Sequence, residues 1–222
     1  MHLNMYSAMI NVSSYFKSAA INWQLSWQQK GFRYKLFIAL FFIALLFIFS
    51  PYFFQYIEQR KGFIFNDAIL NLLPHYDMYI LIFFLLWSNA FLILVEAIKK
   101  PDIFLTFLTS FIILSVARAL SIFLFPLEAP QGIINLTDPL TNYFYGANFI
   151  TKDLFFSGHT ATLFLMFLCH DKKLIKYYTL ISCLCLSILL LIQHIHYSVD
   201  VIFAFPFSFL CYKGAKFIIL RT

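Results

Sequence analysis

The chain consists mainly of long apolar runs separated by short polar or charged segments. Six runs have, or nearly have, the roughly 20 residues that a helix needs to cross the hydrocarbon core of a bilayer. They lie at residues 36–57, 78–98, 103–125, 152–170, 176–195 and 198–220. Backbone groups in lipid must be hydrogen-bonded within the chain, so these runs predict helices rather than strands. The run at 152–170 is the weakest, because Ser157-Gly158-His159-Thr160 interrupts it.

The first 34 residues show a different pattern, in which apolar residues recur at steps of three and four. These residues are Met5, Met9, Val12, Phe16, Ala20, Trp23 and Trp27. Their spacing predicts an amphipathic helix, which either packs on the rest of the protein or lies in the lipid headgroup layer. The segment lacks the apolar core of a cleavable signal. We therefore divide the chain into an interfacial segment, 1–34, and a six-helix transmembrane domain, 35–222.

The composition supports this division. Of the 222 residues, 62% are hydrophobic and only 12% are charged, against roughly 25% charged residues in a soluble domain. The mean hydropathy is +0.81. These values exclude a soluble globular protein and a disordered chain. The predicted fold class is an all-α integral membrane protein.

The distribution of Lys and Arg predicts the orientation of the helices. With six spans, both termini share one side, and that side carries most of the basic residues: Lys17, Lys30, Arg33, Lys35, Lys99, Lys100, Lys172, Lys173, Lys176, Lys213, Lys216 and Arg221. The other side carries only Arg60, Lys61 and Lys152. By the positive-inside rule both termini are cytoplasmic, and the loops 58–77 and 126–151 face the periplasm, exterior or lumen. In a bacterium this would be the inner membrane. The net charge of +6 then reflects orientation and does not indicate a nucleic-acid partner.

The four cysteines do not indicate a disulfide framework or a metal site. Cys169, Cys183, Cys185 and Cys211 all lie in or beside apolar runs. The pair Cys183 and Cys185 is too small a ligand set for a metal. Packing is the better interpretation.

Titratable residues inside the runs gather in one layer near the predicted outer face. They are Arg118, His159, His194, His196 and Asp200. Ionisable residues in a membrane are costly and are functional candidates by default. Two others, Glu96 and His170, fall near the opposite face and are interpreted as ordinary interface residues.

The spacing in this layer predicts chemistry on phosphate. His196 and Asp200 are four residues apart, which places them on one helix face, so the carboxylate can orient the imidazole as a nucleophile or base. Ser157 and Gly158 stand at an expected helix start, where N–H groups favour an anion. Arg118 adds a permanent positive charge with a geometry suited to phosphate.

Structural explanations remain open for two of these residues. His194 alone could make a helix–helix hydrogen bond, and Arg118 could pair with a carbonyl or with Glu128. For His159, His196 and Asp200 together, the shared depth favours a common function.

Two motifs resemble the signatures of the sphingomyelin synthase family, a branch of the type 2 phosphatidic acid phosphatase superfamily. They are Phe156-Ser-Gly-His-Thr160, within the longer Lys152–Thr160 stretch, and His196-Tyr-Ser-Val-Asp-Val201. Supporting likenesses are Arg118 followed by Pro126-Leu-Glu-Ala-Pro130 and, more weakly, Leu73-Pro74 with Asp77. The resemblance covers roughly residues 64–212 and fits the six-span count.

The resemblance implies a set of roles. His196 would be the nucleophile, oriented by Asp200, and His159 the acid/base. The reaction would move a phospho-headgroup from a phospholipid to ceramide or diacylglycerol, without a metal or other cofactor, at the outer or lumenal leaflet. His194 stands where an ancillary histidine is expected.

The sequence also departs from the broader phosphatases of the superfamily. Those carry a Lys and an Arg-Pro in their first motif and an Arg six residues before the second histidine. Here the latter position is Leu190, and no Lys…Arg-Pro segment exists. Fewer cations suit a phosphodiester better than a phosphomonoester. The alternatives are phospholipase C-like cleavage with water as acceptor, a lipid phosphate phosphatase, a non-enzymatic lipid transporter and a structural membrane scaffold.

Overall fold

Helices make up most of the part of the chain that the computed structural model describes, residues 16–134 and 150–221. Residues 16–28 are helical. The elements that follow are α2 (Lys30–Gln59), the 3₁₀ turn η1 (Leu70–Leu72), α3 (Tyr79–Lys99), α4 (Pro101–Leu124), α6 (Gly158–Cys169), α7 (Lys173–Ile192) and α8 (Ser198–Arg221). The described residues contain no strand, only an isolated bridge between Phe63 and Leu127.

Five of these helices are long and apolar enough to cross a membrane: α2, α3, α4, α7 and α8. The prediction of an all-helical, multi-pass membrane protein is therefore confirmed. The remaining predicted span, 152–170, contains α6, which has 12 residues and is about 18 Å long, against a hydrocarbon core of about 30 Å. The count of six complete spans is not confirmed.

The predicted fourth run was wrong at its start, because residues 152–157 are not helical. Other parts of the protein satisfy this irregular backbone. Arg118 Nε donates to Phe156 O at 3.0 Å and Ser121 Oγ donates to Phe155 O at 2.7 Å, both from α4. Non-helical backbone in a membrane protein is tolerated where protein groups bond it in this way. Apolar residues before Ser157 extended the predicted run, although they are not helical.

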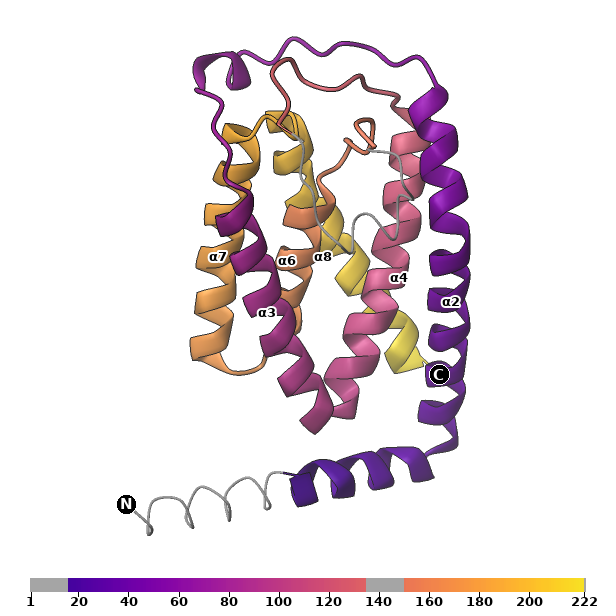
Figure 1. The fold of residues 1–222 in the computed structure, drawn as a ribbon. Coiled ribbons are helices and arrows are strands. Elements are labelled where there is room, and N and C mark those ends of the chain that lie inside the picture. Colours follow the sequence, from indigo (N-terminus) through magenta and orange to yellow (C-terminus); the bar gives the residue numbers. More distant parts are fainter. Residues whose placement is uncertain (1–15, 135–149, 222) are drawn as a thin grey trace, which may run out of the picture.

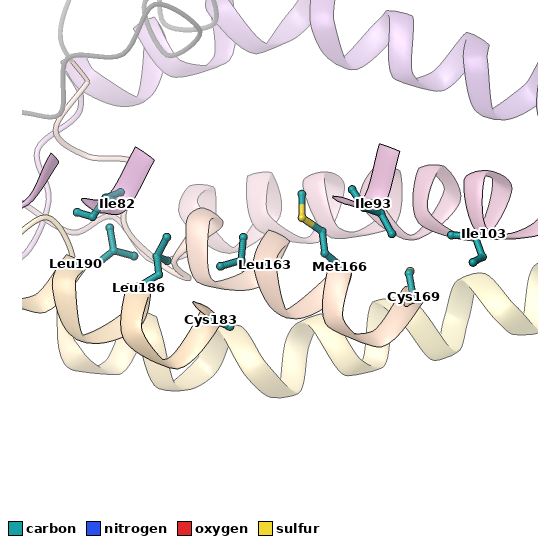
Figure 2. Close-up of a cluster of buried hydrophobic side chains, with 9 residues drawn as sticks. All are labelled: Ile82, Ile93, Ile103, Leu163, Met166, Cys169, Cys183, Leu186 and Leu190. Atoms are coloured by element: carbon teal, nitrogen blue, oxygen red, sulfur yellow. The ribbon is translucent and has the colours of Figure 1, made fainter. Parts of the chain in front are cut away.

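α6 lies at the centre of the bundle and packs against α3, α4, α7 and α8 (Figure 1). Figure 2 shows one of the apolar clusters that hold it. Leu163, Met166 and Cys169 of α6 meet Ile82 and Ile93 of α3, Ile103 of α4, and Cys183, Leu186 and Leu190 of α7. Hydroxyl groups reinforce these contacts, since Ser208 Oγ of α8 donates to Ala161 O at 3.1 Å. The start of α6, which carries His159, is thereby fixed on several sides.

The long connections gather at one end of the bundle, called the loop end below (Figure 1). The described parts of these connections are residues 60–78, 125–134 and 150–157, and the short turn 193–197 lies at the same end. Glu58 at the end of α2 accepts from Thr151 N at 2.8 Å and Lys152 N at 3.1 Å. Gly62 lies so close to the neighbouring connection that a Cβ would stand 2.6 Å from Leu127 C. The connections are therefore bonded to each other and to α2.

Helix 16–28 lies across the opposite end of the bundle (Figure 1). Asn22 Nδ2 donates to Lys99 O at 3.0 Å and Trp23 Nε1 donates to Ile98 O at 2.7 Å, where α3 ends. The predicted Met5, Met9 and Val12 of the amphipathic face lie outside the described residues. Gln29 interrupts the helix, so α2 begins at Lys30, upstream of the boundary expected after residue 34.

All four cysteines are free thiols, and Cys169, Cys183 and Cys211 are buried. Their packing among apolar side chains agrees with the sequence interpretation. Glu96 and His170, expected near the opposite face, are only 4% and 1% exposed. Glu96 Oε2 and His170 Nδ1 are 2.6 Å apart. This buried pair joins the ends of α3 and α6 away from the loop end.

Candidate active site

Two histidines and an aspartate from separate elements meet at the loop end. The ring centroids of His159 and His196 are 6.4 Å apart. His196 Nδ1 lies 3.5 Å from Asp200 Oδ2, and these two side chains are 2% and 0% exposed. The sequence predicted that His196 meets Asp200 and that His159 lies at the same depth. The structure places these three residues side by side.

The separation between His196 and Asp200 is longer than a hydrogen bond. His159 Nδ1, His196 Nδ1 and Asp200 Oδ1 are buried, and none has a hydrogen-bond partner within residues 16–134 and 150–221. Buried polar atoms without a partner are costly and occur at reactive sites. These three atoms are therefore candidates for contact with a substrate.

The chain around His196 is a tight turn between α7 and α8. α7 ends at Ile192, three residues before the predicted end, and His194 has a positive φ of 53°. Tyr197 N then donates to Asp200 Oδ2 at 3.0 Å. Asp200 therefore serves twice, since it faces the imidazole and caps the first turn of α8.

The start of α6 is built around Ser157. Its hydroxyl accepts from Thr160 N at 3.4 Å, as expected of an N-cap. Its own N–H donates to Asp200 O at 3.0 Å. This backbone bond ties the helix of His159 to the helix of Asp200 and sets the distance between the two motifs.

Arg118 reaches the same place from α4, two turns before that helix ends. A Cβ on Gly158 would stand 2.5 Å from Arg118 Cζ, so the guanidinium lies directly against the backbone at the start of α6. Arg118 Nη2 donates to Asp153 Oδ1 at 2.5 Å. Of the sequence alternatives for Arg118, pairing with a carbonyl is found, at Phe156 O. Its acidic partner is Asp153, whereas Glu128 accepts from Gly62 N and Lys152 Nζ at 2.7 and 3.1 Å.

His194 belongs to the loops. Its Nδ1 lies 3.0 Å from Gln131 O and its Nε2 lies 3.2 Å from Leu73 O. Its ring also contacts His75, with 5.3 Å between centroids. These contacts support a structural role for His194. The hydrogen bonds join two loops, however, and not two helices as the sequence alternative had it.

Sequence reasoning missed several acidic residues that support this arrangement. They are Glu58, Asp67 and Asp153, and each binds a residue far away in the chain. A weak signal existed for Asp153, which falls within the Lys152–Thr160 stretch. No spacing rule points to the other two, because their partners lie 93 and 131 residues away.

Comparison with known families gives one match. Residues 152–216 match the family model PAP2_C, described as the PAP2 superfamily C-terminal domain. The matched segment begins at Lys152 and contains α6, α7, most of α8 and both histidine motifs. No curated protein sequence matches the chain significantly. The match supports the type 2 phosphatidic acid phosphatase superfamily and does not distinguish the sphingomyelin synthase-like branch.

Proposed function

We propose that this chain is a membrane-embedded enzyme of the sphingomyelin synthase-like branch, which moves or cleaves a phospholipid headgroup through a phosphohistidine. The family match supports a lipid phosphatase or phosphotransferase of some kind. The observation that carries the proposal is the meeting of His159, His196 and Asp200 beside the start of α6. These groups supply a nucleophile, its orienting carboxylate and a separate acid/base.

The proposed reaction has two halves. In the first, a nitrogen of His196 attacks phosphorus, the bond to the diacylglycerol oxygen breaks, and His159 gives that oxygen a proton. Asp200 stabilises the cationic imidazole that results. In the second half, His159 removes the proton from an acceptor hydroxyl, whose oxygen attacks phosphorus and releases His196. The acceptor is ceramide, diacylglycerol or water.

The charge around the site favours a phosphodiester donor. The guanidinium of Arg118 lies against the start of α6. Asp153 Oδ1, 2.5 Å from Arg118 Nη2, offsets part of its charge. A phosphodiester carries one negative charge, whereas a phosphomonoester carries nearly two at neutral pH. A site with one partly compensated cation therefore fits the diester better. Hydrolysis of phosphatidic acid, as by a lipid phosphate phosphatase, is the second candidate.

The proposed side of action is the outer or lumenal leaflet. The charge count of the sequence assigns the long connections to that side, and His159 and His196 lie at the same end of the bundle. Donor and acceptor lipids would then enter from the leaflet at the loop end.

The decisive experiment follows a headgroup label with purified full-length protein. Headgroup-labelled phospholipid is incubated alone, with ceramide or with diacylglycerol, and labelled phosphatidic acid is tested in parallel. We expect label on the acceptor lipid or in water, and none with His196→Ala. Turnover of phosphatidic acid alone would select the phosphatase, and turnover unaffected by His196→Ala would refute both.

The same assay tests the need for metal. Because His196 is a nucleophile without metal activation and Arg118 supplies a positive charge, we expect activity to persist in excess EDTA. Activity that is lost in EDTA and restored by one particular divalent ion would contradict this expectation.

A further inference from the structure

Asp67, in the connection between α2 and α3, is a buried carboxylate that reaches the start of α8. It is 4% exposed. Its Oδ1 accepts from Ile69 N at 3.0 Å and Leu70 N at 3.1 Å, within its own turn. Its Oδ2 accepts from Ser198 N at 2.5 Å. One carboxylate thus joins the turn before η1 to the first residue of α8.

The N–H groups of two successive residues after His196 are held by two different carboxylates. Tyr197 N donates to Asp200 Oδ2 at 3.0 Å, and Ser198 N donates to Asp67 Oδ2. Asp200 lies within α8 and moves with it. Asp67 lies on a separate connection and can therefore fix the turn relative to the rest of the loop end.

The surroundings of Asp67 make this connection rigid. The rings of Phe65 and Tyr197 meet edge to face, with centroids 5.5 Å apart. Leu70 packs with Leu154 and Tyr197 in a buried cluster. Tyr197 Oη donates to Glu128 O at 3.0 Å. Apolar contacts and a hydrogen bond of Tyr197 therefore hold the turn before α8 in place.

The charge state of Asp67 fits this role. Burial by itself raises the pKa of the carboxyl, but hydrogen bonds from Ser198, Leu70 and Ile69 outweigh it and hold the pKa below its ordinary value of 3.8. The group is thus an anion at neutral pH. An ionised acceptor makes stronger hydrogen bonds than a neutral one. Its negative charge also interacts favourably with the helix dipole at the N-terminus of α8.

We propose that Asp67 is a positioning residue for the reaction, which fixes the backbone after His196 and thereby the imidazole relative to Asp200. This inference rests on the proposed function. Asp67 acts through the Ser198 N–H and does not touch the reacting atoms. Small displacements of a reacting group are costly, because a shift of about 1 Å can lower a rate on the order of 10²-fold.

The test compares Asp67→Ala and Asp67→Asn with Asp102→Ala in the full-length protein. Asp102 is an exposed carboxylate in the first turn of α4, at the opposite end of the bundle, and serves as the matched control. The first measurement is amide hydrogen exchange of peptides covering residues 194–201. We expect faster exchange at Tyr197 and Ser198 in Asp67→Ala, a smaller change in Asp67→Asn, which retains one acceptor oxygen, and none in Asp102→Ala.

The second measurement is turnover of a headgroup-labelled phospholipid per active site, counted by phosphoenzyme formation. We expect Asp67→Ala to lower kcat on the order of 10- to 10²-fold while KM changes by less than about twofold. Asp67→Asn should recover part of the loss. A merely structural residue would lower the number of active sites and leave kcat per site unchanged, and that result would overturn the proposal.

The two measurements separate failure of this inference from failure of the proposed function. If the wild-type protein shows no turnover that depends on His196, the proposed function is wrong. Hydrogen exchange at Ser198 then still tests whether Asp67 holds the Ser198 N–H. Unchanged exchange at Ser198 in Asp67→Ala overturns the positioning role whatever the activity. If Asp67→Ala does not fold, Asp67→Asn decides by the same two measurements.

Discussion

At the scale of single residues, Arg118 can lie against the start of α6 only because residue 158 is glycine. A Cβ there would stand 2.5 Å from Arg118 Cζ and 2.8 Å from Nε. The guanidinium is held by Phe156 O and Asp153, so it cannot move aside without loss of these bonds. The glycine and the arginine therefore act as one unit.

Gly158→Ala should accordingly lower turnover although alanine favours a helix. We expect kcat/KM for the phospholipid donor to fall on the order of 10- to 10²-fold, because the displaced cation no longer faces the phosphate. Gly214→Ala is the matched control, since a Cβ there meets nothing within 4 Å. It should keep wild-type activity. An active Gly158→Ala enzyme would show that Arg118 does not bind the phosphate.

Asp200→Asn tests the orienting carboxylate. Asparagine keeps an acceptor for the Tyr197 N–H, so the turn and the fold should persist. The neutral amide cannot stabilise the cationic imidazole, and we expect kcat to fall on the order of 10²- to 10⁴-fold, as in a triad that loses its carboxylate. Stopped-flow or quench measurement of phosphoenzyme formation gives the rate. Near wild-type phosphorylation would leave Asp200 only its capping role.

Trapped phosphoenzyme also distinguishes the two histidines. His196→Ala should abolish acid-labile, base-stable phosphate on the protein, whereas His159→Ala should slow both half-reactions. If the label persisted in His196→Ala and vanished only in His159→Ala, their roles would be exchanged.

At the scale of elements, Glu128 joins the two long connections at the loop end. The hydrogen bond from Gly62 N lowers the pKa of Glu128, burial opposes this, and Lys152 lowers it further, so the pKa lies below its ordinary value of 4.5. A lowered pKa stabilises the fold above pH 4.5, and this contribution is lost as the pH falls through the folded-state value.

Glu128→Gln should therefore destabilise the protein at neutral pH and less so in acid. We expect the difference in Tm between wild type and variant to be largest above about pH 5 and to shrink below about pH 4. Thermal unfolding in detergent across this range measures it. A difference in Tm that does not change with pH would mean that the charge of Glu128 contributes nothing.

The elements show what the sequence could and could not predict. Hydropathy located the long helices and the i, i+4 spacing located His196 and Asp200, because both signals are local. The helix start expected at Ser157 and Gly158 is found. The apolar run was begun too early, at residue 152, because Arg118 and Ser121 of α4 bond the non-helical backbone before Ser157. The contact of Asp67 with Ser198 spans 131 residues, and no local pattern encodes such a distance.

At the scale of the whole molecule, the bundle has two chemically different ends. The loop end carries His159, His194, His196, Asp67, Glu128 and Asp153. Helix 16–28, the α3–α4 turn and the C-terminal part of α8 lie at the other end (Figure 1), together with most of the basic residues. Under the proposed function, the orientation of the bundle decides which leaflet supplies the lipids.

The positive-inside count predicts that the loop end faces the outside or the lumen. We expect this to be measurable with two exposed lysines, Lys61 in the first connection and Lys172 between α6 and α7. Each is changed to cysteine, Lys61→Cys and Lys172→Cys, after replacement of the four native cysteines. A membrane-impermeant maleimide added to intact cells should label the first variant only, and both after the membrane is opened. Labelling of Lys172→Cys alone in intact cells would reverse the orientation and place the histidines on the cytoplasmic leaflet. The chemistry at His196 could then still hold, but the donor and acceptor lipids would have to come from that leaflet.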